Sequence, residues 1–184
     1  MLEIIAAILG TIYIVLEYKA SPWLWFFNIL VAGIYIYEFY QYGIYANALI
    51  QVYYLIIGVY GWLLWKGLLK KGDKKEKEIS SLPKKFYFPL TIITIILSIL
   101  FSFILKQYTD SQVWLLDGIS TAISFVAMWL LAKKYYQQWI LWIIVEPIII
   151  LISIKTQMYA TAVLYFIYTI IAIKGYYKWK QASK

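Results

Sequence analysis

Two tryptophans and one carboxylate share a face of a single apolar segment in the last third of the chain. Trp139, Trp142 and Glu146 follow one another at spacings of three and four residues. That spacing places all three within about 60° on one face of an α-helix. Indole rings stack on flat rings and attract cations, and a carboxylate offsets positive charge. The pattern therefore predicts a receptor for a flat, positively charged heteroaromatic ring.

The position of each side chain along the segment separates their roles. Trp139 lies near the start, where tryptophan commonly belongs to the aromatic belt at the lipid–water interface, and that role stays open. Trp142 lies deeper, and its indole N–H needs a partner there. Glu146 lies near the middle, out of easy reach of either end. Pro147 follows it, removing a backbone donor and favouring a local kink.

A second polar stripe runs along the apolar segment at 44–66. Asn47, Gln51 and Tyr54 recur there at helical spacing. Amide side chains both donate and accept hydrogen bonds, as recognition of hydroxyls or ring nitrogens requires. Asn28, near the inner end of the preceding segment, is a further candidate. Hydrogen bonding between neighbouring helices is the alternative role for Gln51 and Asn28.

Asp117 lies about one turn inside a further apolar segment. Thr121 and Ser124 share its helical face. A charged side chain in the bilayer costs at least about 2.5–3.5 kcal/mol at a helix centre, so this stripe must face other helices or water. It is either part of a binding site or a surface for close helix packing.

Three other carboxylates belong to segment ends. Glu3 and Glu17 are expected to be solvated at the membrane interface. Glu38 lies near the outer end of its segment, where it either gates a pathway or reaches the lipid head groups.

These side chains require a membrane-embedded scaffold. Of 184 residues, 64% are hydrophobic and 14% are charged, against roughly 45–50% and about 25% in a soluble domain. A soluble protein this small cannot bury so much apolar side chain. Backbone groups in lipid must be satisfied internally, so the spans are helices. Runs of about 20 apolar residues cross the hydrocarbon and predict an all-α membrane protein with about seven transmembrane helices at 2–18, 22–41, 44–66, 86–106, 112–132, 137–154 and 158–178.

The lysines predict the orientation of these helices. All 17 basic residues are lysines, and fifteen of them lie near the end of the first, third, fifth or seventh apolar run or after it. Only Lys106 and Lys155 fall on the other side. The positive-inside rule then places the N-terminus outside and the C-terminus in the cytoplasm. Topology also accounts for the net charge of +8 without a nucleic-acid partner.

The two halves of the chain repeat each other at an ungapped shift of 114 residues. Under that shift Trp25, Gly61 and Trp65 fall on an identical residue in the second half, and Lys19 and Lys66 fall on lysines. Four helices lie within the shift, so both triplets face the same way across the membrane. We expect a 3+1+3 plan of parallel repeats, a plan found in some transporters. Residues 1–66 form the first repeat, 67–111 a polar, solvated cytoplasmic loop with linking helix four, and 112–184 the second repeat.

Several function classes lack the residues they need. The chain contains no cysteine and no histidine, which rules out disulfides, Cys/His metal sites and Cys/His nucleophilic catalysis. No phosphate-binding Gly-x-x-x-x-Gly-Lys-[Ser/Thr] run is present. We therefore expect neither an enzyme nor a cofactor, and any transport is passive or coupled to something the sequence does not display.

Together, these motifs resemble the PnuC family of bacterial vitamin transporters over essentially the whole chain. The resemblance rests on Trp139-x-x-Trp142-x-x-x-Glu146. It is supported by the segment from Tyr45 through Gln51 to Tyr60-Gly61-Trp62, by Trp114-x-x-Asp117, and by the closing Gly175-Tyr176-Tyr177-Lys178-Trp179.

The resemblance implies a facilitator, related in fold to SWEET and SemiSWEET sugar transporters, that carries nicotinamide riboside across the bacterial inner membrane. It further implies that a cytoplasmic kinase traps the vitamin by phosphorylation and that homotrimers are a candidate assembly. Trp139, Trp142, Gln51 and the polar residue at position 146 would line the site.

Two departures keep alternatives open. Family members often carry Asn or Asp where this chain has Glu146, and Pro147 beside it is unusual. Thiamine, whose ring is also cationic, is the alternative substrate. A non-transporting membrane assembly or structural protein is a more distant alternative.

Overall fold

Helices are the regular elements of the chain. The computed structural model describes residues 2–41, 45–69 and 78–184, and the side chains of 2–8, 38–41, 45–49 and 160 lie outside that description. Within it, a single 3-10 turn (Lys84–Phe86) and seven α-helices follow one another: α1 (Leu2–Tyr18), α2 (Trp23–Gln41), α3 (Tyr45–Trp65), α4 (Tyr87–Tyr108), α5 (Trp114–Ala132), α6 (Gln138–Lys155) and α7 (Tyr159–Ala182). The predicted all-α fold is confirmed, and every helix boundary but the end of α7 lies within two residues of its prediction.

Length and composition mark several of these helices as membrane spans. Three helical stretches in the described part of the chain are long and apolar enough to cross a bilayer: Lys84–Tyr108, Trp114–Ala132 and Gln138–Lys155. Shorter apolar stretches occupy Leu9–Tyr18, Trp23–Tyr37 and Ile50–Trp65.

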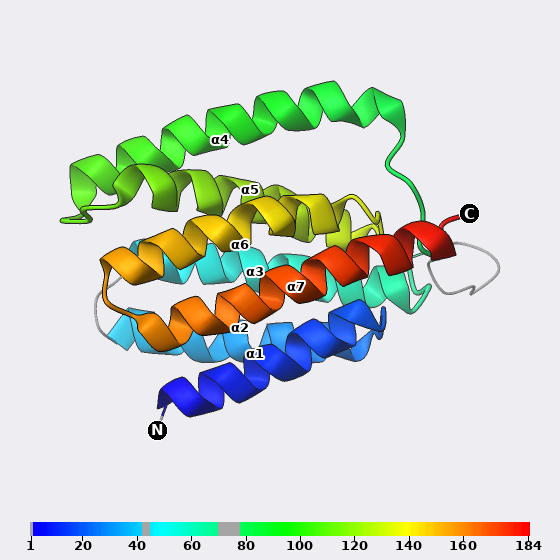
Figure 1. Ribbon diagram of the computed structural model, residues 1–184, viewed down its shortest axis with the longest axis horizontal. Helices are drawn as coiled ribbons and strands as arrows, with labels where there is room; N and C mark the ends of the chain where they lie inside the picture. Colours follow the sequence, from blue (N-terminus) through cyan, green and yellow to red (C-terminus); the bar gives the residue numbers. More distant parts are fainter. Residues whose placement is uncertain (1, 42–44, 70–77) are drawn as a thin grey trace. The chain divides into compact units, whose positions relative to one another are not determined.

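The chain divides into two compact units. The first contains Met1–Glu78 together with Ala132–Lys134, and the second contains Ile79–Leu131 and Tyr135–Lys184. In the first unit α2 and α3 pair along their length and α1 contacts α2 (Figure 1). In the second unit α6 and α7 form the corresponding pair.

One tryptophan pair locks α2 to α3. The rings of Trp25 and Trp65 meet edge to face, with centroids 5.5 Å apart and planes at 88°. Both side chains are fully buried. Gly61 lies against the Trp25 indole so closely that a Cβ at this position would overlap the ring. The glycine is required here because it lets the two helix backbones approach.

The same arrangement recurs between α6 and α7, at the predicted shift of 114 residues. The rings of Trp139 and Trp179 lie 5.7 Å apart at 89°, and Gly175 is pressed against the Trp139 indole. The repeated residues therefore make the same contacts in both helix pairs: two tryptophans meet edge to face, and a glycine packs against one of them.

The turns that lead into these helix pairs also match. Ala20 and Lys134, 114 residues apart, both adopt the left-handed conformation with φ of 53°. In both turns the next amide donates to a carbonyl five residues earlier, at 2.9 Å for Ser21 and 3.0 Å for Tyr135. This hydrogen bond is typical of a Schellman helix ending, in which the left-handed residue is usually glycine.

Helix α4 packs on α5 through one narrow stripe. Gly118 of α5 lies directly against Ser102 of α4, and the rings of Phe101 and Phe125 are 5.1 Å apart. Only 6% of the apolar window in this helical stretch is buried. The remaining face is apolar and exposed, as expected of a surface solvated by lipid.

Residues 132–134, at the end of α5 and just after it, contact the end of α3, and we call this segment the clip. The indole Nε1 of Trp65 donates to the carbonyl of Ala132 at 3.0 Å. The ammonium of Lys134 lies 4.2 Å from the Trp65 ring centroid, and Lys133 donates to the hydroxyl of Tyr60. Lys134 is only 5% exposed, so this cation–π contact is largely withdrawn from solvent.

The polar stretch between α3 and α4 is not solvated throughout, contrary to the prediction. The Tyr136 amide donates to the Ser80 carbonyl at 3.1 Å. The Gln137 amide group accepts from the Leu82 backbone and donates to the Ser81 hydroxyl, each at 2.9 Å. Leu82 is buried. The end of this stretch is therefore held against the start of α6, because Gln137 accepts from one of its backbone amides and donates to one of its hydroxyl groups.

Candidate substrate-binding residues

Helix α6 buries the predicted central carboxylate. Glu146 is 3% exposed, next to the fully buried Val145. Pro147 lies inside the helix, where it cannot donate to the carbonyl four residues earlier and so leaves one backbone acceptor of this turn free. A carboxylate buried in an apolar span places negative charge where it acts strongly on a nearby cation.

Trp139 lies in the protein interior and not on the surface that an aromatic belt residue would occupy. It is 0% exposed and packs on Trp179 and Gly175 of α7. Its repeat counterpart Trp25 makes the same contacts in the first unit. A side chain in this position has a packing role whatever else it does, and its part in binding remains a prediction.

Three neighbouring side chains at the start of α6 carry buried polar atoms that are not satisfied. The indole nitrogens of Trp139 and Trp142 and both amide atoms of Gln138 have no hydrogen-bond partner within the described residues. Buried polar groups are nearly always satisfied, so a ligand or water is expected there. The sequence predicted this need for Trp142. Gln138 was missed, although an amide inside an apolar run was the available signal.

On α5, the predicted stripe is partly internal to the helix. The side chains of Asp117 and Thr121 are hydrogen-bonded to each other. Ser124 donates to the Ser120 carbonyl at 2.8 Å, a bond within one helix that supports packing more than recognition. Asp117 and Thr121 are both partly exposed, so they remain the candidates from this helix.

The first unit holds the other predicted residues. Asn28 of α2 presses its side chain on Gly58 of α3, and its Oδ1 is buried without a hydrogen-bond partner among the described residues. Tyr54 packs beside Tyr53 with ring centroids 5.7 Å apart, and Gln51 is partly exposed. The side chain of Asn47 lies outside the described part of the structure.

The prediction for Glu17 is wrong. This carboxylate near the end of α1 is 1% exposed, not solvated. It lies within electrostatic range of Tyr13, which is in turn within range of Tyr54. Position along the helix suggested solvent, whereas packing of α1 in the first unit buries the side chain. Glu3 and Glu38 lie outside the described side chains.

Comparison with known proteins adds a family. A family model described as nicotinamide mononucleotide transporter matches residues 1–181. The nicotinamide riboside transporter PnuC of Haemophilus influenzae is 28% identical over 185 residues, covering 100% of this chain and 80% of the relative. PnuC of Escherichia coli is 25% identical over 211 residues, covering 100% and 86%. PnuC of Neisseria mucosa is 22% identical over 193 residues, covering 98% and 72%.

A solved structure shares the fold. The crystal structure of the vitamin B3 transporter PnuC matches this chain with a TM-score of 0.73 and 20% identity, covering 97% of this chain and 80% of the other.

Proposed function

Because the chain belongs to the nicotinamide mononucleotide transporter family, we propose that it is a membrane transporter of nicotinamide riboside. The resemblance to PnuC drawn from its residues is confirmed. The observation that carries the substrate is the carboxylate of Glu146, 3% exposed in α6 and one turn from the buried Trp142 indole nitrogen. A pyridinium ring needs both a π surface and a compensating negative charge.

Charge favours the riboside over the mononucleotide. The mononucleotide adds a phosphate group, which a buried carboxylate would repel. Helices α1, α2, α3 and α5 contain no lysine, and the lysines of α4, α6 and α7 lie towards their C-terminal ends. Within α6 itself, the only lysine is Lys155, nine residues from Glu146.

We further propose that substrate-binding residues lie in each unit. Those of the second unit are Trp139, Trp142, Glu146, Asp117 and Thr121, and those of the first are Asn28, Asn47, Gln51 and Tyr54. The helices would follow a 3+1+3 plan of parallel repeats like that of SWEET transporters, with repeats at 1–66 and 112–184 joined by 67–111. The repeated tryptophan–glycine device of the two helix pairs supports this plan.

The same proposal covers the cellular setting. The protein would lie in the bacterial inner membrane with its N-terminus outside, act as a facilitator, and depend on a cytoplasmic vitamin kinase to trap its substrate. A homotrimer is the proposed assembly. The lack of a nucleotide-binding motif supports facilitated diffusion.

The test is substrate-dependent stabilisation followed by transport. Purified protein is heated with nicotinamide riboside, nicotinamide mononucleotide, thiamine or riboflavin, and then reconstituted in liposomes for counterflow of labelled nicotinamide riboside. We expect the riboside alone to raise the melting temperature and to exchange. Stabilisation by thiamine without any effect of the riboside would make thiamine the substrate.

A further inference from the structure

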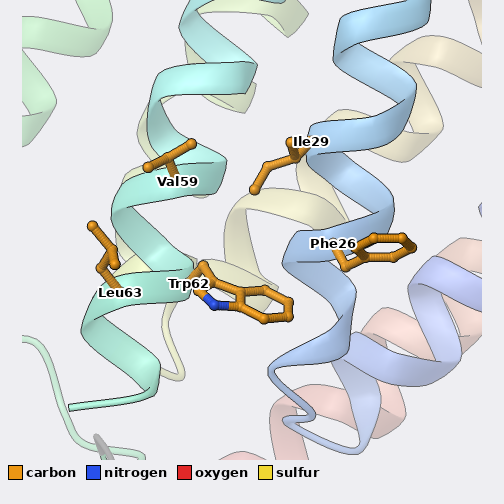
Figure 2. Close-up of a pocket in the computed structure, with 5 residues that line it drawn as sticks. All are labelled: Phe26, Ile29, Val59, Trp62 and Leu63. Carbon is orange, nitrogen blue, oxygen red and sulfur yellow. The ribbon is translucent and has the colours of Figure 1, made fainter. Parts of the chain in front are cut away.

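A shallow apolar groove runs between α2 and α3 on the surface of the first unit. Its volume is about 160 Å³. Figure 2 shows the two helices with these side chains between and beside them. The lining residues are Phe26, Ile29, Val59, Trp62 and Leu63.

One end of the groove carries an aromatic rim. Trp23 is 56% exposed and meets Trp62 edge to face, with centroids 5.8 Å apart. Its ring centroid is 6.1 Å from that of Phe26. Amphipathic indoles of this kind favour the depth of the lipid head groups, whereas the other end of the groove is purely aliphatic.

A cation stands at the rimmed end. The ammonium of Lys66 lies 5.9 Å from the Trp62 ring centroid, and the side chain is exposed. Within the described ranges, no carboxylate forms an ion pair with it. Along α3 the surface therefore changes from aliphatic at Val59, through aromatic at Trp62, to positive at Lys66.

We propose that this groove binds an anionic phospholipid, with one acyl chain between α2 and α3 and the phosphate group at Lys66. The sequence of surfaces along α3 matches the sequence of groups along a lipid molecule. In a bilayer, apolar contact alone gives no preference for one occupant, so packing in the groove and the charge at its end must supply the selectivity.

The second unit offers a matched site in which these features are missing. Under the 114-residue shift Lys66 corresponds to Lys180, whose ammonium lies 5.3 Å from the Tyr176 ring centroid. Lys180 additionally donates to the Tyr176 hydroxyl at 3.2 Å. Gln137 stands where Trp23 stands, and it is buried and hydrogen-bonded to Ser81. The second lysine is thus already engaged and has no exposed tryptophan beside it.

The experiment measures lipid binding to the purified full chain by native mass spectrometry, with phosphatidylglycerol competing against phosphatidylcholine of the same acyl chains. We expect wild-type protein to favour phosphatidylglycerol, and Lys66→Gln to lower that preference about fivefold, the effect of one lysine at a lipid surface. Lys180→Gln, the matched control, should keep the preference. Val59→Trp, which fills the groove, should lower binding of both lipids.

Three results would overturn the proposal. Equal loss in Lys66→Gln and Lys180→Gln would mean that lipids respond to overall charge. Unchanged preference in Lys66→Gln would remove the head-group contact. A change of oligomeric state in Val59→Trp would make the groove an interface between two copies of the chain. None of these results depends on transport of a vitamin.

Discussion

Glu146 concentrates the chemistry of the proposed site. It is buried in the middle of α6, and the corresponding position of the first repeat is Ala32, which is also buried. The repeated scaffold thus holds a carboxylate in one half and a methyl group in the other. A substrate with one positive charge needs one carboxylate. A carboxylate in only one half of the chain therefore fits the proposed substrate.

Glu146→Gln keeps the size of the side chain and removes its charge. We expect affinity for nicotinamide riboside to fall roughly 10-fold to 100-fold, since a hydrogen bond or contact to a charged group is worth about 1.5–3 kcal/mol. Titration calorimetry on purified protein measures this. The protein should remain folded, because glutamine has nearly the same size and can both donate and accept hydrogen bonds. The exposed Glu78, changed to Gln, serves as control, and equal affinities of all three proteins would refute the role of Glu146.

Alanine substitution should change the stability of the protein in opposite directions at packed glycines and at an unpacked one. Gly61→Ala and Gly175→Ala should each destabilise the protein by about 1–3 kcal/mol, because the added methyl group overlaps an indole ring. Gly33 has nothing within 4 Å of the corresponding position, so Gly33→Ala should stabilise α2 by about 0.5–1 kcal/mol. Unfolding in detergent measures all three. Similar effects of the three substitutions would show that helix propensity, and not packing, dominates.

At the level of elements, the sequence predicted more of the fold than of the site. Apolar run length located every helix, because a bilayer demands complete spans. The 114-residue shift also marked the repeated tryptophans and glycines, but it did not predict that they would pack on one another. Burial of Glu17 could not be anticipated, because the position of α1 against its neighbours is a tertiary property. The contacts of Gln137 likewise depend on a distant stretch of chain that contains Ser81.

The turn before α6 differs from its counterpart before α2 in one decisive respect. Both have a residue at φ of 53°, but Ala20 is small whereas Lys134 reaches the Trp65 ring at 4.2 Å. The clip therefore adds a contact to a repeated turn. The clip belongs to the same compact unit as α3.

Glycine substitution separates the cost of the left-handed backbone conformation from the gain of the Lys134 cation–π contact. Ala20→Gly should stabilise the protein by up to about 1 kcal/mol, since glycine adopts the left-handed conformation without steric cost. Lys134→Gly gains the same relief but loses a desolvated cation–π contact worth about 2 kcal/mol. We therefore expect a net loss of about 1 kcal/mol in thermal unfolding. Equal stabilisation by both substitutions would mean that the clip contributes nothing.

At the scale of the whole molecule, the distribution of lysines is the sequence feature that specifies direction across the membrane. Fifteen of 17 lysines lie towards the C-terminal ends of odd-numbered spans or in the segments that follow them. The translocation cost of lysine-rich segments keeps them in the cytoplasm. The proposed substrate enters from outside and is trapped inside. We therefore expect every copy of the protein to have the same orientation in the membrane.

The absence of cysteine from the chain makes that orientation directly measurable. Thr109→Cys, between α4 and α5, should react with a membrane-impermeant maleimide in intact right-side-out vesicles, because it follows an even-numbered span. Gln181→Cys, in the last turn of α7, should react only after permeabilisation. Both native side chains are exposed, so accessibility within the protein does not confuse the comparison. The reverse labelling pattern would place the lysine-rich segments outside, against the charge argument, and would also require the lipid proposed at Lys66 to lie in the outer leaflet.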